Sequence, residues 1–101
     1  MKQYVLGEGA ERDLNEIWEY IARDSIDAAD RWISKLFTTF TTLARNPGMG
    51  HKRLELTSHA ILFWPVGGYV ILYRVRNKRV EIVGVTQGAR DIPSFLDHRT
   101  Q

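Results

Sequence analysis

The stretch YVILYRVRNKRVEIVGVT, residues 69–86, decides the fold of this chain. Residues 69–75 are rich in β-branched and aromatic side chains, which predicts a strand. The Asn77-Lys78 pair predicts a two-residue hairpin turn, because asparagine tolerates the left-handed backbone conformation. Residues 80–86 then predict the returning strand. The stretch therefore predicts an antiparallel hairpin within a small sheet.

Two more strands are expected around this hairpin. Residues 60–66, with Pro65 marking the end, predict a strand that completes a three-stranded antiparallel meander. Residues 3–6 predict a short strand near the N-terminus. The segment from His51 to Ser58 is expected to be a polar connection outside the sheet.

The N-terminal half of the chain has helical spacing. Residues 8–23 predict a helix with an apolar stripe, and Asp24-Ser25-Ile26 breaks the pattern. A second helix is expected to begin at Asp27 as N-cap, with Asp30 in a capping-box-like position, and to end at residues 46–50. Trp18 and Trp32 lie on the apolar stripes and are expected in the core. The sequence thus predicts an α+β fold, in which an N-terminal strand is followed by an antiparallel helical hairpin packed on a small antiparallel sheet.

Composition limits the classes of function. The 101 residues, 44% of them hydrophobic, predict one domain over residues 1–101. The absence of cysteine excludes disulfides and thiolate metal sites, and His51 and His59 lie too far from other ligands to predict a metal, so no cofactor is expected.

Residues 1–50 carry six Lys/Arg against eight Asp/Glu, whereas residues 51–101 carry eight against four. This basic excess is too small to predict sequence-specific nucleic-acid binding. No apolar run approaches the roughly 20 residues of a membrane helix, and no signal peptide is recognised, so a cytoplasmic location is expected.

Five blocks of the sequence, taken together, resemble ParE toxins of the RelE/ParE superfamily. They are AERDLNEIWEYIA (10–22), DAADR (27–31), LARNPGMG (43–50), FWPVGGYVILYRV (63–75) and VTQGARD (85–91). Their order and spacing match the family, although Gln87 stands where similar proteins commonly have histidine. The resemblance implies a toxin that inhibits DNA gyrase by binding. It also implies a ParD-like antitoxin whose disordered C-terminal half wraps the toxin.

Several side chains are candidates for the toxic surface. Lys52 and Arg53 precede the sheet, Arg74 lies on its central strand and Arg90 follows its last strand. The Phe95-Leu96 tail either folds back as a lid on the core or contacts a partner.

The antitoxin has its own candidate contacts, Trp64, Tyr69 and Arg74. A disordered partner can add a strand to an exposed sheet edge while its helix fills a hydrophobic groove. Trp64 is either a core residue or a partner contact. Arg74 is expected either to pair with a carboxylate of the first helix or to face an acidic groove of a partner.

Two other functions remain open. Related RelE-type toxins cleave messenger RNA on the ribosome, which requires an acid, a base and cations around the phosphate. Arg74, Arg90 and Glu55 could contribute to such a site, but Leu96 stands where a terminal acid is expected and Gln87 cannot exchange protons usefully. The histidines, His51, His59 and His98, are expected at the surface. The other alternative is an inactive toxin-fold binding module, so the sequence favours a binding toxin with no catalytic residue.

Overall fold

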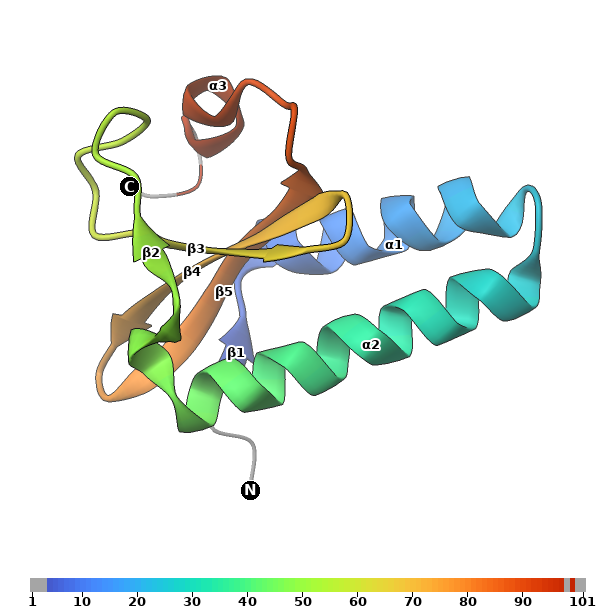
Figure 1. The fold of residues 1–101 in the computed structure, drawn as a ribbon, viewed down its shortest axis with the longest axis horizontal. Helices are drawn as coiled ribbons and strands as arrows, with labels where there is room; N and C mark the ends of the chain where they lie inside the picture. The colour runs from blue at the N-terminus through green and yellow to red at the C-terminus, as the bar shows by residue number, and fades with distance from the viewer. Residues whose placement is uncertain (1–3, 98, 100–101) are drawn as a thin grey trace.

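The computed structural model describes residues 4–97 and 99 (Figure 1). The helices are α1 (Glu8–Ala22), α2 (Ile26–Arg45), the 3₁₀ turn η1 (Pro47–Met49) and α3 (Ile92–Leu96). The strands are β1 (Tyr4–Leu6), β2 (His51–Lys52), β3 (Leu62–Val66), β4 (Tyr69–Arg76) and β5 (Arg79–Gln87). This is the α+β fold expected from the sequence.

The strands form one sheet in the order β1-β5-β4-β3-β2. The β4–β5 hairpin forms as predicted, and its turn residues Asn77 and Lys78 have φ angles of 53° and 63°. The N-terminal strand is confirmed, but it pairs with β5 in parallel. It can do so because the two long helices intervene between these strands and return the chain to the sheet.

Two expectations at the other edge of the sheet are wrong. His51 and Lys52 are not a polar connection but the short strand β2, which pairs with Phe63 and Leu62 of β3. The next strand begins at Leu62 rather than at Ala60, although it ends at Val66 as expected, with Pro65 opposite Val70. Proline is tolerated there because β2 does not extend alongside this part of β3.

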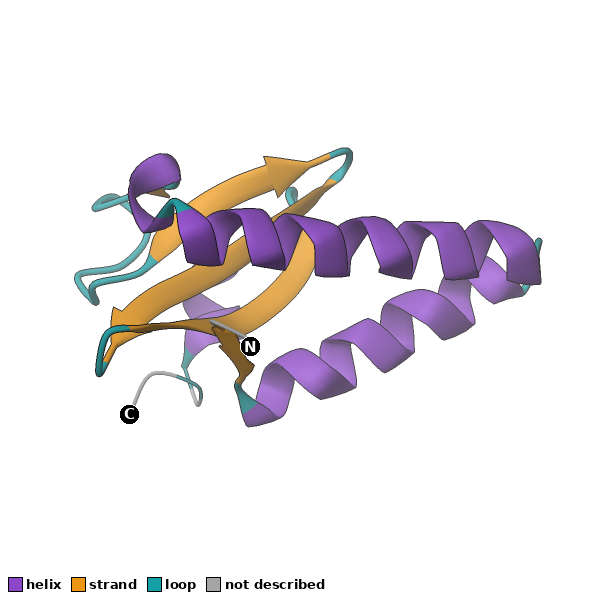
Figure 2. Cartoon of the chain, turned by 90° about the horizontal axis from the view of Figure 1, so that it is seen from below, coloured by secondary structure: helices purple, strands orange, loops and turns teal. Residues whose placement is uncertain are grey.

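The second helix begins earlier than expected. Ser25, not Asp27, is its N-cap, and the Ser25 hydroxyl oxygen accepts a hydrogen bond from the Ala28 amide at 3.1 Å. Ser25 has an extended backbone, as an N-cap requires, and Asp27 already lies in the first helical turn. The two long helices then lie side by side as the predicted hairpin (Figure 2).

Each face of the sheet has its own core. The main core lies between the sheet and the helical hairpin, and Trp32 packs against it as expected. Trp18 does not belong to it: the side chain is half-buried, and its indole N–H donates to Asp30 at 2.8 Å. The second core lies on the opposite face, where α3 and the loop between β2 and β3, through Leu56 and Ile61, cover the strands.

The entry to β2 is fixed by a buried tyrosine of β4. The hydroxyl of Tyr73 donates to the carbonyl of Pro47 and accepts from the amide of Gly50, both at 2.8 Å. Burial raises the pKa of Tyr73, whereas the hydrogen bond from Gly50 lowers it, and the first effect is the larger. Tyr73 thus joins the end of the helical hairpin to the centre of the sheet.

Candidate functional site

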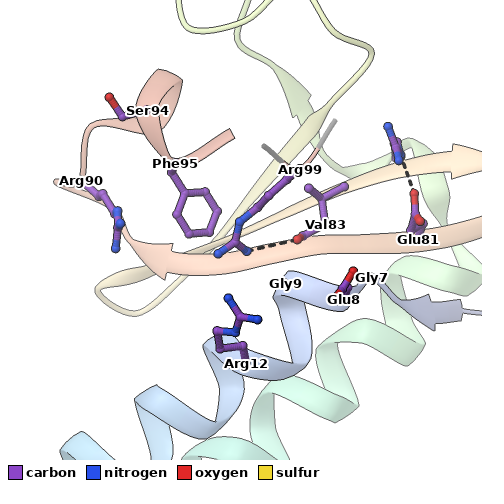
Figure 3. Close-up of a pocket in the computed structure, with 11 residues that line it drawn as sticks. Gly7, Glu8, Gly9, Arg12, Glu81, Val83, Arg90, Ser94, Phe95 and Arg99 are labelled. Atoms are coloured by element: carbon purple, nitrogen blue, oxygen red, sulfur yellow. Dashed lines mark hydrogen bonds and ion pairs between the residues drawn. The ribbon is translucent and has the colours of Figure 1, made fainter. Parts of the chain in front are cut away.

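A cavity of about 500 Å³ opens on the α3 face of the sheet, where α1 begins (Figure 3). Four arginines from distant parts of the chain line it: Arg12, Arg74, Arg90 and Arg99. Two carboxylates, Glu8 and Glu81, also line it, together with Gly7, Gly9, Val83, Ser94 and Phe95. The cavity therefore brings together four cations that lie far apart in the sequence.

The Phe95 side chain forms one wall of this cavity. Phe95 is 6% exposed and lies in the second core, with Leu96 at 3%. Asp91 caps the short helix α3 by accepting from the amide and hydroxyl of Ser94. The Phe95-Leu96 tail is expected from the sequence either to fold back on the core or to contact a partner. The structure therefore shows the first arrangement.

Glycine at position 84 makes room for this wall. A Cβ atom there would lie 2.7 Å from the Phe95 ring and 2.8 Å from the Arg99 guanidinium. Contacts this short would require either side chain to move. Gly84 thus allows the tail to pack directly on β5.

Arg99 ties the C-terminal segment to α1. Its guanidinium donates to both carboxylate oxygens of Asp13, at 2.6 and 2.9 Å, and lies 4.0 Å from the centre of the Phe95 ring. Asp13 also accepts from the amide of Val85 at 3.1 Å. A carboxylate that is 6% exposed is thereby fully engaged, as buried charge requires.

Arg74 pairs within the sheet. Its Nε donates to Glu81, the residue opposite it on β5, at 2.5 Å. The expectation of a partner on the first helix is therefore wrong. The registered antiparallel neighbour is closer than any carboxylate of α1, and both partners are largely buried.

Arg12 and Arg90 remain without a carboxylate partner among the described residues. Both are exposed on one side, and Arg90 lies 5.1 Å from the centre of the Phe95 ring. Figure 3 shows Arg12 reaching up from α1 toward Arg99, with Arg90 beside Phe95. These two guanidiniums are the cations of the cavity that make no ion pair among the described residues.

A second cavity, of about 480 Å³, lies farther along the same face, and Arg90 borders both. His51, Arg53 and Tyr69 also line it. Arg53 is held by Glu55 in an exposed ion pair. Lys52 is exposed on β2 and lines neither of these two cavities.

The expected antitoxin contacts do not share one face. Trp64 and Tyr69 are half-buried against the main core, and Trp64 stacks on His51 with the ring centres 6.4 Å apart. Arg74 lies on the other face of the sheet, in the arginine cavity. A partner that touches all three must therefore wrap around the edge of the sheet.

Sequence reasoning missed Arg12, Asp13 and Arg99. Arg12 and Arg99 gave no sign of a shared site, because they lie near opposite ends of the chain. Asp13 did give one, since it lies on the apolar stripe of α1 between Ala10 and Ile17. A carboxylate in that position needs a buried partner.

The described residues include no group of three or more His, Cys, Asp or Glu that could hold a metal ion. His98, one of the three histidines considered from the sequence, lies outside the described residues. No helix in the described part of the chain is long and apolar enough to cross a membrane.

Comparison with known proteins places this chain in a family. The profile described as "ParE toxin of type II toxin-antitoxin system, parDE" matches residues 4–92. Toxin RelE3 of Caulobacter vibrioides is 28% identical over 85 residues, which cover 84% of this chain and 92% of that protein. The toxin candidate Y4kP of Sinorhizobium fredii is 34% identical over 86 residues, covering 84% of this chain and 86% of that protein.

A solved structure shares the fold. It is described as the chromosomal ParDE TA system from P. aeruginosa, and its matching chain superposes with a TM-score of 0.72 at 16% identity. The match covers 86% of this chain and 96% of that one. On the family profile and the 34% identical relative, this chain belongs to the ParE family of toxins of type II toxin–antitoxin systems.

Proposed function

We propose that this toxin acts in the cytoplasm as a single domain that inhibits DNA gyrase by binding, and that a ParD-like antitoxin neutralises it. The observation that carries the proposal is the match to the ParE profile over residues 4–92, nearly the whole chain. Fold alone does not fix the target within this superfamily, so the proposal also depends on the chemistry of the α3 face of the sheet, where the two cavities open.

That face supports binding better than catalysis. It carries several arginines, and Arg90 lines both cavities. Leu96, at the position expected of a terminal acid, is buried in the second core. Glu55, the carboxylate considered as a base, is engaged with Arg53. The toxic surface that we propose is centred on Arg90 and includes Arg74, Arg53 and Lys52. Phe95 and Leu96 support it from beneath.

The test uses purified, antitoxin-free toxin in two parallel assays. One assay follows supercoiling and DNA cleavage by gyrase, and the other follows cuts in messenger RNA on translating ribosomes. We expect loss of supercoiling with intact messenger. The Arg90→Ala variant should need about tenfold more toxin for half-inhibition, which corresponds to about 1.4 kcal/mol of binding free energy.

A matched control separates this effect from general loss of charge. Lys78→Ala removes one cation from the exposed hairpin tip, away from both cavities, and should leave inhibition within about twofold. Normal supercoiling at all toxin concentrations would reject the gyrase proposal.

One observation favours a RelE-type ribonuclease as the alternative. His51, Arg53 and Arg90 line the second cavity together, which brings an imidazole and two guanidiniums to one place. An imidazole can exchange a proton near neutral pH, and the guanidiniums can stabilise a phosphate. The similarity to a protein named Toxin RelE3 points the same way.

The ribosome assay decides between the two. Codon-phased cuts that disappear in His51→Ala, with normal gyrase activity, would establish the nuclease. His59→Ala is the matched control, because His59 is also exposed but does not line the second cavity. A folded protein that neither affects gyrase, nor cuts messenger, nor arrests growth would instead be an inactive binding module.

A further inference from the structure

The charges of the arginine cavity are unevenly neutralised. At one end, Arg74 is bonded to Glu81. Arg99 is bonded through both nitrogens to Asp13. This leaves Arg12 and Arg90 against a single carboxylate, Glu8, that makes no ion pair among the described residues.

Such an arrangement favours the binding of an anion. Arg12 and Arg90 border the same hollow without an ion pair, so their charges repel one another. The effective dielectric constant beside a protein wall is lower than that of water, which strengthens this repulsion. An incoming anion would remove it and form charge-assisted hydrogen bonds with two planar donor groups.

The walls of the cavity favour a carboxylate on a peptide over a nucleic acid. A nucleic acid strand would need exposed aromatic rings for its bases and a continuous row of cations for its phosphates. Phe95 is 6% exposed and is already covered by Arg90 and Arg99. Glu8 and Glu81 interrupt the row of cations.

We propose that this cavity binds a carboxylate side chain of an acidic peptide segment, with Arg12 and Arg90 as its hydrogen-bond donors. Arg99 contributes charge while it stays bonded to Asp13. The proposal rests on the proposed function only in assigning the segment to the antitoxin. An acidic side chain seated there would cover Arg90 and so block the surface that we propose for toxicity.

The test measures binding of a fluorescent oligoglutamate peptide to the antitoxin-free, 101-residue toxin chain by anisotropy at low salt. An oligothymidylate of equal charge is the competing probe. We expect the peptide to bind more tightly than the oligonucleotide. The double variant R12Q/R90Q should lower peptide affinity about tenfold, because it removes both free donors.

Two further variants keep the result specific. K78Q/R79Q removes the same number of charges from the exposed hairpin tip and should change peptide affinity by less than about twofold. E8Q removes the unpaired carboxylate from the cavity and should raise peptide affinity about two- to threefold. Thermal unfolding of each variant checks that the fold is retained.

Several outcomes would overturn the proposal. They are equal losses from the two double variants, no measurable peptide binding, or an oligonucleotide that binds at least as tightly through Arg12 and Arg90. The assay contains neither gyrase nor ribosomes. A failure here therefore leaves the gyrase proposal standing, and a failure in the gyrase assay leaves this one standing.

Discussion

Replacing Asp13 with alanine should destabilise the toxin strongly, because three hydrogen bonds converge on its carboxylate. Two come from the Arg99 guanidinium and one from the amide of Val85. The Asp13 side chain is 7% exposed and that of Arg99 is 21% exposed. Asp13→Ala would leave a cation and a backbone amide without their partner.

The expected loss follows from this burial. Removing one partner of a buried ion pair costs about 3–5 kcal/mol, and the partial exposure of Arg99 places the value near the lower end, about 3 kcal/mol. For a domain of this size, each kcal/mol lowers the midpoint of thermal unfolding by about 4–8 °C, so the total shift is roughly 12–24 °C.

The assay is urea unfolding followed by tryptophan fluorescence, with the slope checked for two-state behaviour. The control is Glu55→Ala, which breaks the exposed pair with Arg53 and should cost about 1 kcal/mol or less. Arg99→Ala and the double variant complete a cycle, whose coupling free energy should exceed about 1 kcal/mol. If the free energy of unfolding of Asp13→Ala lies within about 1 kcal/mol of the wild-type value, the Asp13–Arg99 pair contributes little and the reasoning fails.

Three further changes test the fold. Ser25→Ala should cost about 1 kcal/mol in urea unfolding through loss of the N-cap of α2, and an unchanged midpoint would contradict that role. Because burial raises the pKa of Tyr73 above its usual 10.0, the folded state favours the protonated phenol. The free energy of unfolding should therefore be at its full value below pH 10 and fall as the pH rises further, less steeply in Tyr73→Phe, and parallel curves would refute this. Gly67→Ala should cost about 1–3 kcal/mol of stability, because φ at this position is +58° and the added Cβ would lie 2.8 Å from the Trp32 ring. An unchanged midpoint of thermal unfolding in calorimetry would contradict this.

Much of the architecture could be predicted because local patterns determine it. The β-branched and aromatic residues of 69–86 give the hairpin, and the helical spacing of the first half gives α1 and α2. The errors fall where pairing partners decide the outcome. His51 becomes a strand residue because Phe63 lies beside it, and β3 begins only at Leu62, where its pairing with Tyr73 starts.

The site depended on tertiary structure far more than the fold did. The sequence by itself provided the cations Arg74 and Arg90 and the α+β fold that carries them. It could not pair Asp13 with Arg99, which lie 86 residues apart, or seat the tail against Gly84. Hydrophobic periodicity records which side of an element is buried, but it carries no information about which distant charge will meet it there. Only the folded chain decides which arginines of the cavity meet a carboxylate, as Arg74 and Arg99 do, and which do not, as with Arg12 and Arg90.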